Sequence, residues 1–241
     1  MAERKIQFVN EEIYHIVMRA IDGINLFCDK QDYLRMIHDL FEFNDVNPIL
    51  STFRSVCYRG KFNTTQQGRV AFLNKSGRKR KLLVEILAFC LMPNHVHLLV
   101  RQLRVNGISR FMQKFGGYAS YYNKKHRRRG HLFQDKFKAV HIKDNEQLQT
   151  VFVYIHTNPV AIIFPGWKEK GIKDFKKARN YIESYRWSSY SDYLGEKNFP
   201  SITSREFLKK VMGKPKDCRK FVNDWLRYKQ ELADFDEVVI E

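Results

Sequence analysis

Two apolar segments separated by a short turn constrain the fold of this chain more than any other feature. Residues 82–91 read LLVEILAFCL and residues 95–102 read HVHLLVRQ, with Met-Pro-Asn between them. Apolar runs of this length, rich in β-branched residues, are typical of strands, and Pro and Asn are common turn residues. The pattern predicts a β-hairpin, so at least this part of the chain forms an antiparallel sheet.

The segments around the hairpin alternate between strand and helix patterns. Alternating apolar residues predict strands, and apolar residues at a spacing of three and four predict helices. The expected elements are strands at 13–20 and 132–142 and helices at 29–45, 106–129 and 144–158. With the hairpin, the first six elements run βαββαβ. We therefore expect an α+β fold, a ferredoxin-like antiparallel sheet with helices on one face, followed by a helical C-terminal extension.

Local signals indicate where the predicted helices begin or weaken. Asp29 precedes the first helix and can accept hydrogen bonds from its free backbone N–H groups, and Asp144 or Asn145 can do the same for the last one. Gly116 and Gly117 fall in the middle of the long helical pattern, where glycine is unfavourable. We therefore expect well-defined starts for the first and last helices and a weak centre in the helix at 106–129.

The remaining segments suggest how the chain is divided. We expect residues 1–160 to form the main domain and residues 161–241 to form an extension of mixed charge. Residues 46–81 are polar, contain GRKRK near their end, and read as a basic insertion. The sequence RWSSY at 186–190 could dock the extension onto the main domain.

The charge balance indicates an anionic partner. The chain of 241 residues has 43 Lys and Arg against 26 Asp and Glu, a net charge of +17 and a pI near 9.7. A hydrophobic content of 44% is typical of a folded protein. Such an excess of positive charge favours nucleic acid first and an acidic membrane surface second. A solvated basic surface is the simpler alternative.

Cysteine usage and hydropathy suggest a compartment. Cys28, Cys57, Cys90 and Cys218 are far apart and form no CxxC pair, which is typical of reduced thiols rather than of a disulfide framework. No apolar run approaches the roughly 18 residues that a membrane helix needs, and the N-terminus lacks the apolar centre of a signal peptide. We expect a soluble, cytoplasmic protein without a membrane partner.

His95 and His97 lie two residues apart in the second hairpin strand. Residues at this spacing point to the same face of a sheet, so both imidazoles would project together. Two histidines on one face, with a third ligand from elsewhere, commonly hold a divalent cation. The alternative is that both are ordinary half-buried strand residues.

Tyr154 and Asn158 are four residues apart in the last predicted helix, so they share one face. A tyrosine there could be a nucleophile. An asparagine carbonyl could be a ligand to Mg²⁺ or Mn²⁺. The alternative is that Tyr154 packs in the core and that Asn158, which precedes Pro159, only ends the helix.

Four motifs in this order resemble the REP-associated tyrosine transposases, which are HUH single-tyrosine transposases similar to insertion-sequence transposases. The motifs are MPNHVHLLV, GHLFQDKFKAV, YIHTNPV and YRWSSYSDYLG, and the resemblance covers about residues 11–195. It implies a ferredoxin-like catalytic domain within residues 1–160, with a divalent metal, Mg²⁺ or Mn²⁺, as cofactor.

The resemblance also implies roles for single residues. His95 and His97 correspond to the metal ligands and Tyr154 to the nucleophile that attacks single-stranded DNA. Asn158 occupies the position at which related transposases have a glutamine ligand, so it keeps the amide oxygen on a shorter side chain. The implied reaction is cleavage and rejoining of hairpin or REP-type palindromic DNA through a 5′-phosphotyrosine link.

Basic residues interleaved with aromatic ones suggest how DNA is held. Lys and Arg neutralise phosphates, and exposed rings can stack on bases. Phe133 and Phe137 are expected in the core, and His141 and His156 are expected to be structural. The candidate DNA-binding residues are Lys124, Lys125, Arg127, Arg128, Arg129, Lys136 and Lys138, together with Arg78, Lys79 and Arg80.

Two other functions compete with the transposase. A non-catalytic, ferredoxin-like nucleic-acid-binding protein would bind DNA tightly and in a salt-sensitive way, without cleaving it. A nuclease that uses the histidine pair to activate water would cleave DNA without needing Tyr154. The resemblance is compatible with both a monomer and a homodimer.

Overall fold

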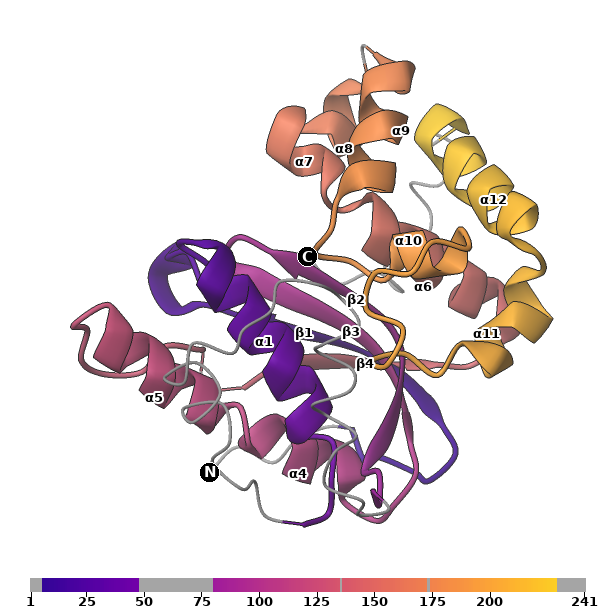
Figure 1. Ribbon diagram of the computed structural model, residues 1–241. Helices are drawn as coiled ribbons and strands as arrows, with labels where there is room; N and C mark the ends of the chain where they lie inside the picture. Colours follow the sequence, from indigo (N-terminus) through magenta and orange to yellow (C-terminus); the bar gives the residue numbers. More distant parts are fainter. Residues whose placement is uncertain (1–5, 48–79, 135, 173, 229–241) are drawn as a thin grey trace.

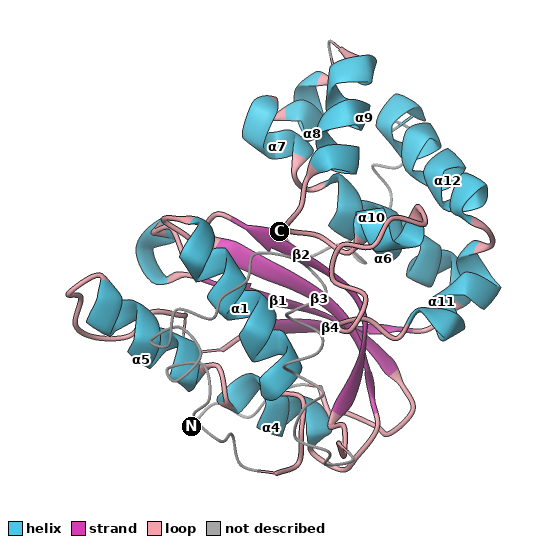
Figure 2. Ribbon diagram, viewed as in Figure 1, coloured by secondary structure: helices cyan, strands magenta, loops and turns pink. Residues whose placement is uncertain are grey.

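The computed structural model describes residues 6–47, 80–134, 136–172 and 174–228. Most of the expected insertion at 46–81, with Arg78 and Lys79, lies outside the described residues. Figures 1 and 2 show a sheet in the middle of the molecule, with helices against both of its faces.

The four strands found in the described part of the chain form one antiparallel sheet of order β2-β3-β1-β4. Their bounds are Ile13–Arg19 for β1, Val84–Met92 for β2, His95–Gln102 for β3 and Lys138–Ile142 for β4. The first and third strands are therefore neighbours at the centre, as the βαββαβ order requires. The expected α+β, ferredoxin-like fold is confirmed.

The predicted hairpin is present, with Pro93 and Asn94 in its turn. Met92 of β2 pairs with His95 of β3, directly next to the turn. On the other side of β3, His95 pairs with Arg19 of β1. The hairpin thus places the first histidine at the end of both strand ladders.

Helices α1 (Lys30–Glu42), α4 (Gly107–Gln113) and α5 (Gly116–Lys125) cover one face of the sheet, and a 3-10 turn, η1 (Ile21–Gly23), precedes them (Figure 1). Asp29 is the N-cap of α1, as predicted, because its side chain accepts hydrogen bonds from the backbone N–H groups of Gln31 and Asp32. The helices and the sheet enclose a first hydrophobic core that contains Ile16, Val96 and Phe111.

Two predicted boundaries in this layer were wrong. The expected helix at 106–129 is divided into α4 and α5 and ends at Lys125. The break comes directly before Gly116, at the predicted weak centre. At Gly117, inside α5, a Cβ atom would lie 3.2 Å from the ring of Phe43, so glycine permits the close approach of α5 to the C-cap of α1. The expected strand at 132–142 is regular only from Lys138, and Phe133 forms an isolated bridge with Ala20.

Helix α6 (Asn145–Thr157), with Asp144 as its N-cap, lies on the opposite face. The extension supplies α7 (Val160–Ile163), α8 (Trp167–Lys170), α9 (Phe175–Ser184), α10 (Tyr190–Tyr193), α11 (Arg205–Met212) and α12 (Pro215–Tyr228). These helices gather around α6 in Figure 1. Leu99 of the sheet, Phe152 of α6 and Val222 of α12 belong to one second core, so the extension packs on the sheet through α6. The boundary at residue 160 stays a prediction.

The RWSSY segment docks the extension onto the edge of the sheet, as predicted. The N–H of Leu91 donates to Trp187 O at 2.8 Å, and the N–H of Ser189 donates to Phe89 O at 3.0 Å. The segment therefore satisfies backbone groups of β2, which would otherwise be an open edge strand. None of the described helices is long and apolar enough to span a membrane.

Candidate nucleophile and metal site

Alternation along β3 separates the two histidines from their neighbours. His95 and His97 lie on the face that α6 covers, with their ring centroids 4.7 Å apart. Val96 between them is fully buried in the core on the other face. The predicted shared face of the histidine pair is therefore present.

Tyr154 of α6 lies directly against this pair. Its ring centroid is 5.5 Å from that of His97, at an interplanar angle of 86°. The side chain is only 2% exposed, within the second core. The fold thus brings His95, His97 and Tyr154 together from segments 57 residues apart, counting from His97 to Tyr154.

Asn158 lies one turn further along the chain, at the C-cap of α6. Its Nδ2 donates to Tyr154 O at 2.9 Å, within its own helix end. Among the described residues, Asn158 has no hydrogen bond to His95 or His97. Its role as a helix end is visible in this contact, and its role as a ligand stays a prediction.

His15 is one residue of the site that the sequence did not indicate. Its Nε2 lies 3.0 Å from His97 Nδ1, and the two rings are stacked with centroids 5.3 Å apart. His15 also contacts the Tyr154 ring edge-on, at 5.9 Å. On β1, His15 is four residues from Arg19, which pairs with His95, so both point to the sheet face that carries the histidine pair. This alternation along β1 was the sequence signal that could have indicated His15.

All three histidines are held in the neutral form. Burial lowers the pKa of His15 to about 3, and burial together with the charges of Arg19 and Lys168 lowers the pKa of His95 to about 4. The pKa of His97 is lowered well below its usual value by burial first and by the neighbouring histidines and cations second. Neutral imidazoles keep the lone pair that a metal needs.

The free nitrogens of the pair fit a divalent cation. His97 Nε2 is buried and has no hydrogen-bond partner within the described part of the structure, while its Nδ1 is held by His15. His95 Nδ1 is 2.6 Å from Asn94 Oδ1, so its Nε2 is the nitrogen that remains for a ligand role. One held and one free nitrogen is the usual state of a metal-binding histidine.

Two cations border the same site. Lys168 of α8 places Nζ 3.2 Å from the Tyr154 hydroxyl and 4.3 Å from the centre of its ring. Arg19 lies across from His95 in the strand register. Both charges lower the pKa of His95 and His97, after burial, which is the larger cause. The site is therefore electropositive.

A second group of metal-ligand types lies on the other face, where ligand atoms of Cys28, Asp32 and His126 are within 4.8 Å of one another. Asp32 already accepts hydrogen bonds from the Cys28 N–H at 3.0 Å and from Lys125 at 2.7 Å, and it contacts His126 at 3.0 Å. Its carboxylate oxygens are thus engaged by neighbours that join α1 to α5. This cluster reads as a structural link.

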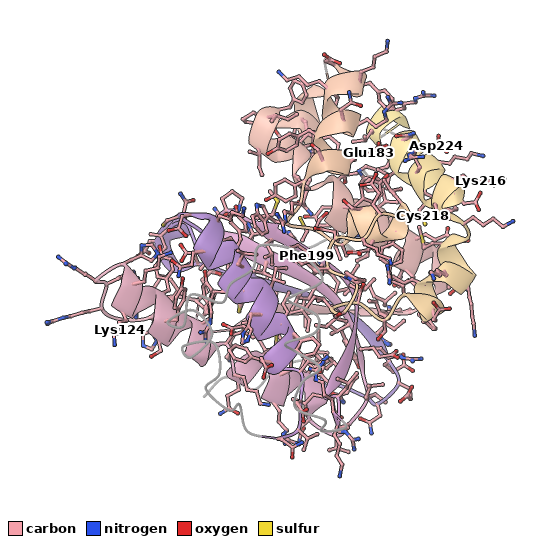
Figure 3. The ribbon with its side chains drawn as sticks, viewed as in Figure 1. Lys124, Glu183, Phe199, Lys216, Cys218 and Asp224 are labelled. Carbon is pink, nitrogen blue, oxygen red and sulfur yellow. The ribbon has the colours of Figure 1, made fainter. Side chains whose placement is uncertain are left out.

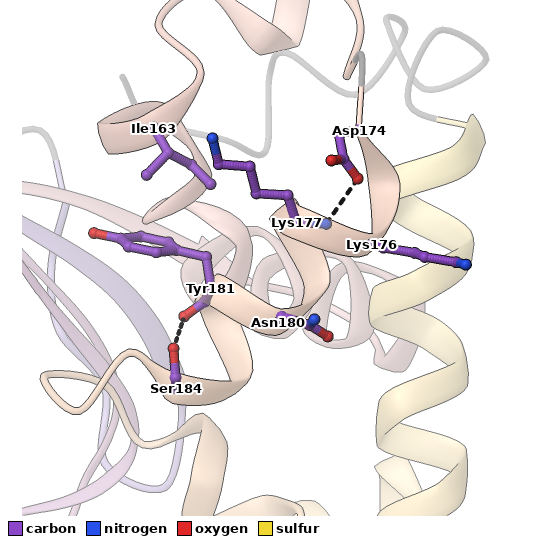
Figure 4. Close-up of a pocket in the computed structure, with 7 residues that line it drawn as sticks. All are labelled: Ile163, Asp174, Lys176, Lys177, Asn180, Tyr181 and Ser184. Carbon is purple, nitrogen blue, oxygen red and sulfur yellow. Dashed lines mark hydrogen bonds between the residues drawn. The ribbon is translucent and has the colours of Figure 1, made fainter.

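A surface pocket on the extension is lined by residues of α7 and α9 and by the N-cap of α9 (Figure 4). Within it, Asp174 accepts the N–H of Lys177 at 2.9 Å, and Ser184 donates to Tyr181 O at 3.0 Å. These contacts end and cap α9. The lining residues are Ile163, Asp174, Lys176, Lys177, Asn180, Tyr181 and Ser184, and none of them is a predicted site residue.

The basic candidates differ in exposure, and several of them have intramolecular contacts. Lys124 projects from the end of α5 (Figure 3). Lys125 is engaged with Asp29 and Asp32; burial alone would lower its pKa, but these hydrogen bonds raise it. Arg128 bonds Asn123, and Arg80 lies 3.6 Å over the Phe41 ring. The exposed candidates are Lys124, Arg127, Arg129, Lys136 and Lys138.

The four side chains expected to be structural have matching contacts. Phe133 and Phe137 pack against the first core as partly buried residues. His156 Nε2 is 2.8 Å from Ser189 Oγ, and His141 Nε2 is 2.8 Å from Glu12. Neither histidine is part of the site.

Fold and site together define a ferredoxin-like α+β domain with a histidine pair facing a helical tyrosine. Residues 56–158 match the family model described as "Transposase IS200 like". The match covers less than half of the chain but includes His95, His97, Tyr154 and Asn158. It agrees with the resemblance of the sequence motifs to insertion-sequence-like transposases.

One solved structure is also similar to this chain, at low sequence identity. A solved structure described as "Structure of the REP associates tyrosine transposase bound to a REP hairpin" is similar, with a TM-score of 0.47 and 13% sequence identity. The similarity covers 86% of this chain and 93% of that chain. No curated protein matches the chain.

Proposed function

We propose that this protein is a metal-dependent transposase that cleaves and rejoins single-stranded DNA with Tyr154 as nucleophile. The observation that carries the proposal is the contact between Tyr154 and His97, with centroids 5.5 Å apart, inside the segment that matches the transposase family. A buried tyrosine beside neutral histidines and two cations suits attack on a phosphate better than it suits simple packing.

The metal would be held by His95 and His97 through Nε2, with Asn158 offering its amide oxygen. A divalent cation bound there supplies neutralisation and orientation of the phosphate. Imidazole ligands favour Mn²⁺ or another transition metal over Mg²⁺, which prefers oxygen. His15 would keep the His97 ring in the orientation and tautomer that leave Nε2 free.

The residues of the chain would perform a balanced exchange of phosphate bonds. A bond forms between Tyr154 Oη and the phosphorus while the bond from phosphorus to the 3′-oxygen breaks. The phenol proton is lost and the departing 3′-oxygen gains one, which leaves a 3′-hydroxyl and a 5′-phosphotyrosine link. Since this link is still a phosphodiester, another 3′-hydroxyl can attack it and rejoin the strands without an added energy source.

Exposed cations at the end of α5 and at the start of β4 would bind the phosphates of the strand. Lys124, Arg127 and Arg129 lie around the end of α5, and Lys136 and Lys138 lie at the start of β4. Phosphate contacts of this kind make binding fall steeply with salt concentration. Hairpin and REP-type palindromic DNA are the substrates that the family resemblance suggests.

The test is covalent adduct formation with a labelled single-stranded oligonucleotide that carries a hairpin, in the presence of Mn²⁺ or Mg²⁺. We expect the wild-type protein to form an adduct that survives denaturation and the Tyr154→Phe protein to form none, because the attacking oxygen is missing. Tyr181→Phe, on α9, is the matched control and should behave as wild type.

The competing functions predict other results. Cleavage that persists in Tyr154→Phe would indicate a nuclease that uses the histidine pair to activate water. Tight, salt-sensitive binding without cleavage under any metal would indicate the non-catalytic nucleic-acid-binding protein. Either result would contradict the proposed nucleophile.

A further inference from the structure

Two cations that lie outside the segment matching the transposase family border the Tyr154 hydroxyl and the histidine pair. We propose that Lys168 and Arg19 form a clamp for the phosphate under attack, and that Lys168 also positions the Tyr154 hydroxyl. This inference rests on the proposed function and extends it, because Lys168 comes from the extension and Arg19 from the first strand. The active site would then need residues that precede and residues that follow the matched segment.

Lys168 is brought to the nucleophile by a short, anchored helix. Trp167 next to it is 2% exposed and buried in the second core, to which α6 also contributes. The Lys168 ammonium donates to the Tyr154 hydroxyl at 3.2 Å and lies over the same ring at 4.3 Å. One cation therefore contacts both the attacking atom and the ring, which restricts the direction of the phenol oxygen.

Arg19 reaches the pair from β1. It is the last residue of β1, it pairs with His95, and it has the strand parity of His15, so its side chain lies on the α6 face. Arg19 is half-buried, and its Nε is buried without a hydrogen-bond partner among the described residues. A guanidinium with an unused donor is suited to bind two phosphate oxygens.

The balance of charge points to an anion between these groups. Lys168 and Arg19 both act on His95 and His97 as neighbouring positive charges. A bound divalent cation would add still more positive charge at this point. A phosphodiester offsets that charge, and donors aimed at its non-bridging oxygens stabilise the charge that develops during attack.

The family match does not contain these residues, since it begins at residue 56 and ends at residue 158. Lys168 follows it and Arg19 precedes it. The proposal therefore gives a role to the extension, which otherwise packs around α6 and covers the β2 edge. It also explains why α8 is held so closely against Tyr154.

The first measurement is the rate of covalent adduct formation on the hairpin oligonucleotide with Mn²⁺. We expect Lys168→Met and Arg19→Met each to slow the reaction by about 10²-fold, the effect of losing one donor to a developing oxyanion. Lys168→Arg should keep part of the rate because it keeps the charge. Lys176→Met, an exposed lysine of the same extension, is the control and should react as wild type.

Two further readouts separate a clamp from a general structural role. Mn²⁺ affinity should be unchanged or higher in both Met variants, because each removes a charge of the same sign as the metal. In protein labelled with [¹³Cζ]tyrosine, without DNA or metal and at one fixed pH, the Tyr154 resonance should shift in Lys168→Met and not in Lys176→Met. Tyr154→Phe assigns that resonance.

The outcomes distinguish this inference from the function on which it rests. If wild-type protein forms the adduct and both Met variants react at the same rate, the clamp is overturned and the transposase proposal stands. An unshifted Tyr154 resonance in Lys168→Met would overturn the positioning of the nucleophile. If the wild-type protein forms no adduct, the proposed function fails and the phosphate clamp fails with it.

Discussion

The two faces of the central sheet are built from the same strands but differ in the side chains they present. On the face covered by α1, α4 and α5, β1 and β3 contribute apolar residues such as Ile16 and Val96 to the first core. On the face covered by α6, the intervening positions carry His15, His95 and His97. Because successive residues of a strand point to opposite faces, the register of β1 with β3 places the apolar residues on one face and the histidines on the other.

The difference shows how a small domain can hold unpaired polar groups in its interior. The apolar face and its helices fix the strands, so the opposite face can keep nitrogen atoms without partners at little risk to the fold. His97 Nε2 and His15 Nδ1 are buried and unpaired among the described residues. Such atoms are rare in folded proteins, and they indicate a ligand or a functional strain.

The neighbours Val96 and His97 offer the strongest test of this separation. His97→Ala should abolish metal-dependent adduct formation, a loss of at least about 10³-fold if the metal is essential to the charge stabilisation. Its Mn²⁺ binding should be lost in the same protein. Isothermal titration and the adduct assay measure the two effects.

Val96→Ala is the matched change on the other face. It removes two buried methyl groups and should lower the free energy of unfolding by about 2 kcal/mol, measured by urea denaturation. Adduct formation per folded molecule should stay near the wild-type rate. If Val96→Ala instead abolished the reaction while the protein remained folded, the two faces would not be separable in this way.

His15 gives a smaller and sharper test, because it touches His97 without being a proposed ligand. His15→Leu removes the group that holds His97 Nδ1 and should weaken Mn²⁺ binding by about 10- to 100-fold, as for other partners of metal-bound histidines. His15→Gln keeps an amide near the position of Nε2 and should retain much of the affinity. Equal affinities in Leu, Gln and wild-type proteins would contradict a positioning role.

Those features of the site that depend on the spacing of nearby residues could be predicted from the sequence. The interval between His95 and His97 predicts a shared strand face, and that between Tyr154 and Asn158 predicts a shared helix face. Asp29 and Asp144 mark helix starts because the side chain next to a free backbone N–H acts over a few residues. These predictions needed no knowledge of tertiary contacts.

The parts that were missed depend on contacts between distant segments. His15 and Lys168 lie far from the hairpin in sequence, and only the pairing of β1 with β3 and the packing of α8 on α6 bring them to the site. The contacts of Arg80 with Phe41 and of Lys125 with Asp29 also join distant segments, so the basic runs alone did not indicate them. The DNA-binding role of both residues stays a prediction.

His156 extends the comparison to a histidine that is buried on the α6 side for a structural reason. Its Nε2 contacts Ser189 Oγ at 2.8 Å, and burial lowers its pKa from 6.5 to about 3. The unfolded chain therefore binds a proton at a higher pH than the folded protein does. Stability from this group is complete above pH 6.5 and falls toward pH 3, with a slope of at most about 1.4 kcal/mol per pH unit.

A variant that cannot titrate isolates this contribution. We expect the unfolding free energy of wild type minus that of His156→Gln to be constant between pH 7 and 8, because His156 is then neutral in both states. The difference should decrease below pH 6.5, the unfolded value, because only wild type then carries the cost of keeping this imidazole neutral. Other histidines and carboxylates occur in both proteins and cancel. A difference that stayed flat down to pH 5 would mean that His156 accepts a proton in the folded protein as easily as in the unfolded chain, and its burial between α6 and the extension would then not keep it neutral.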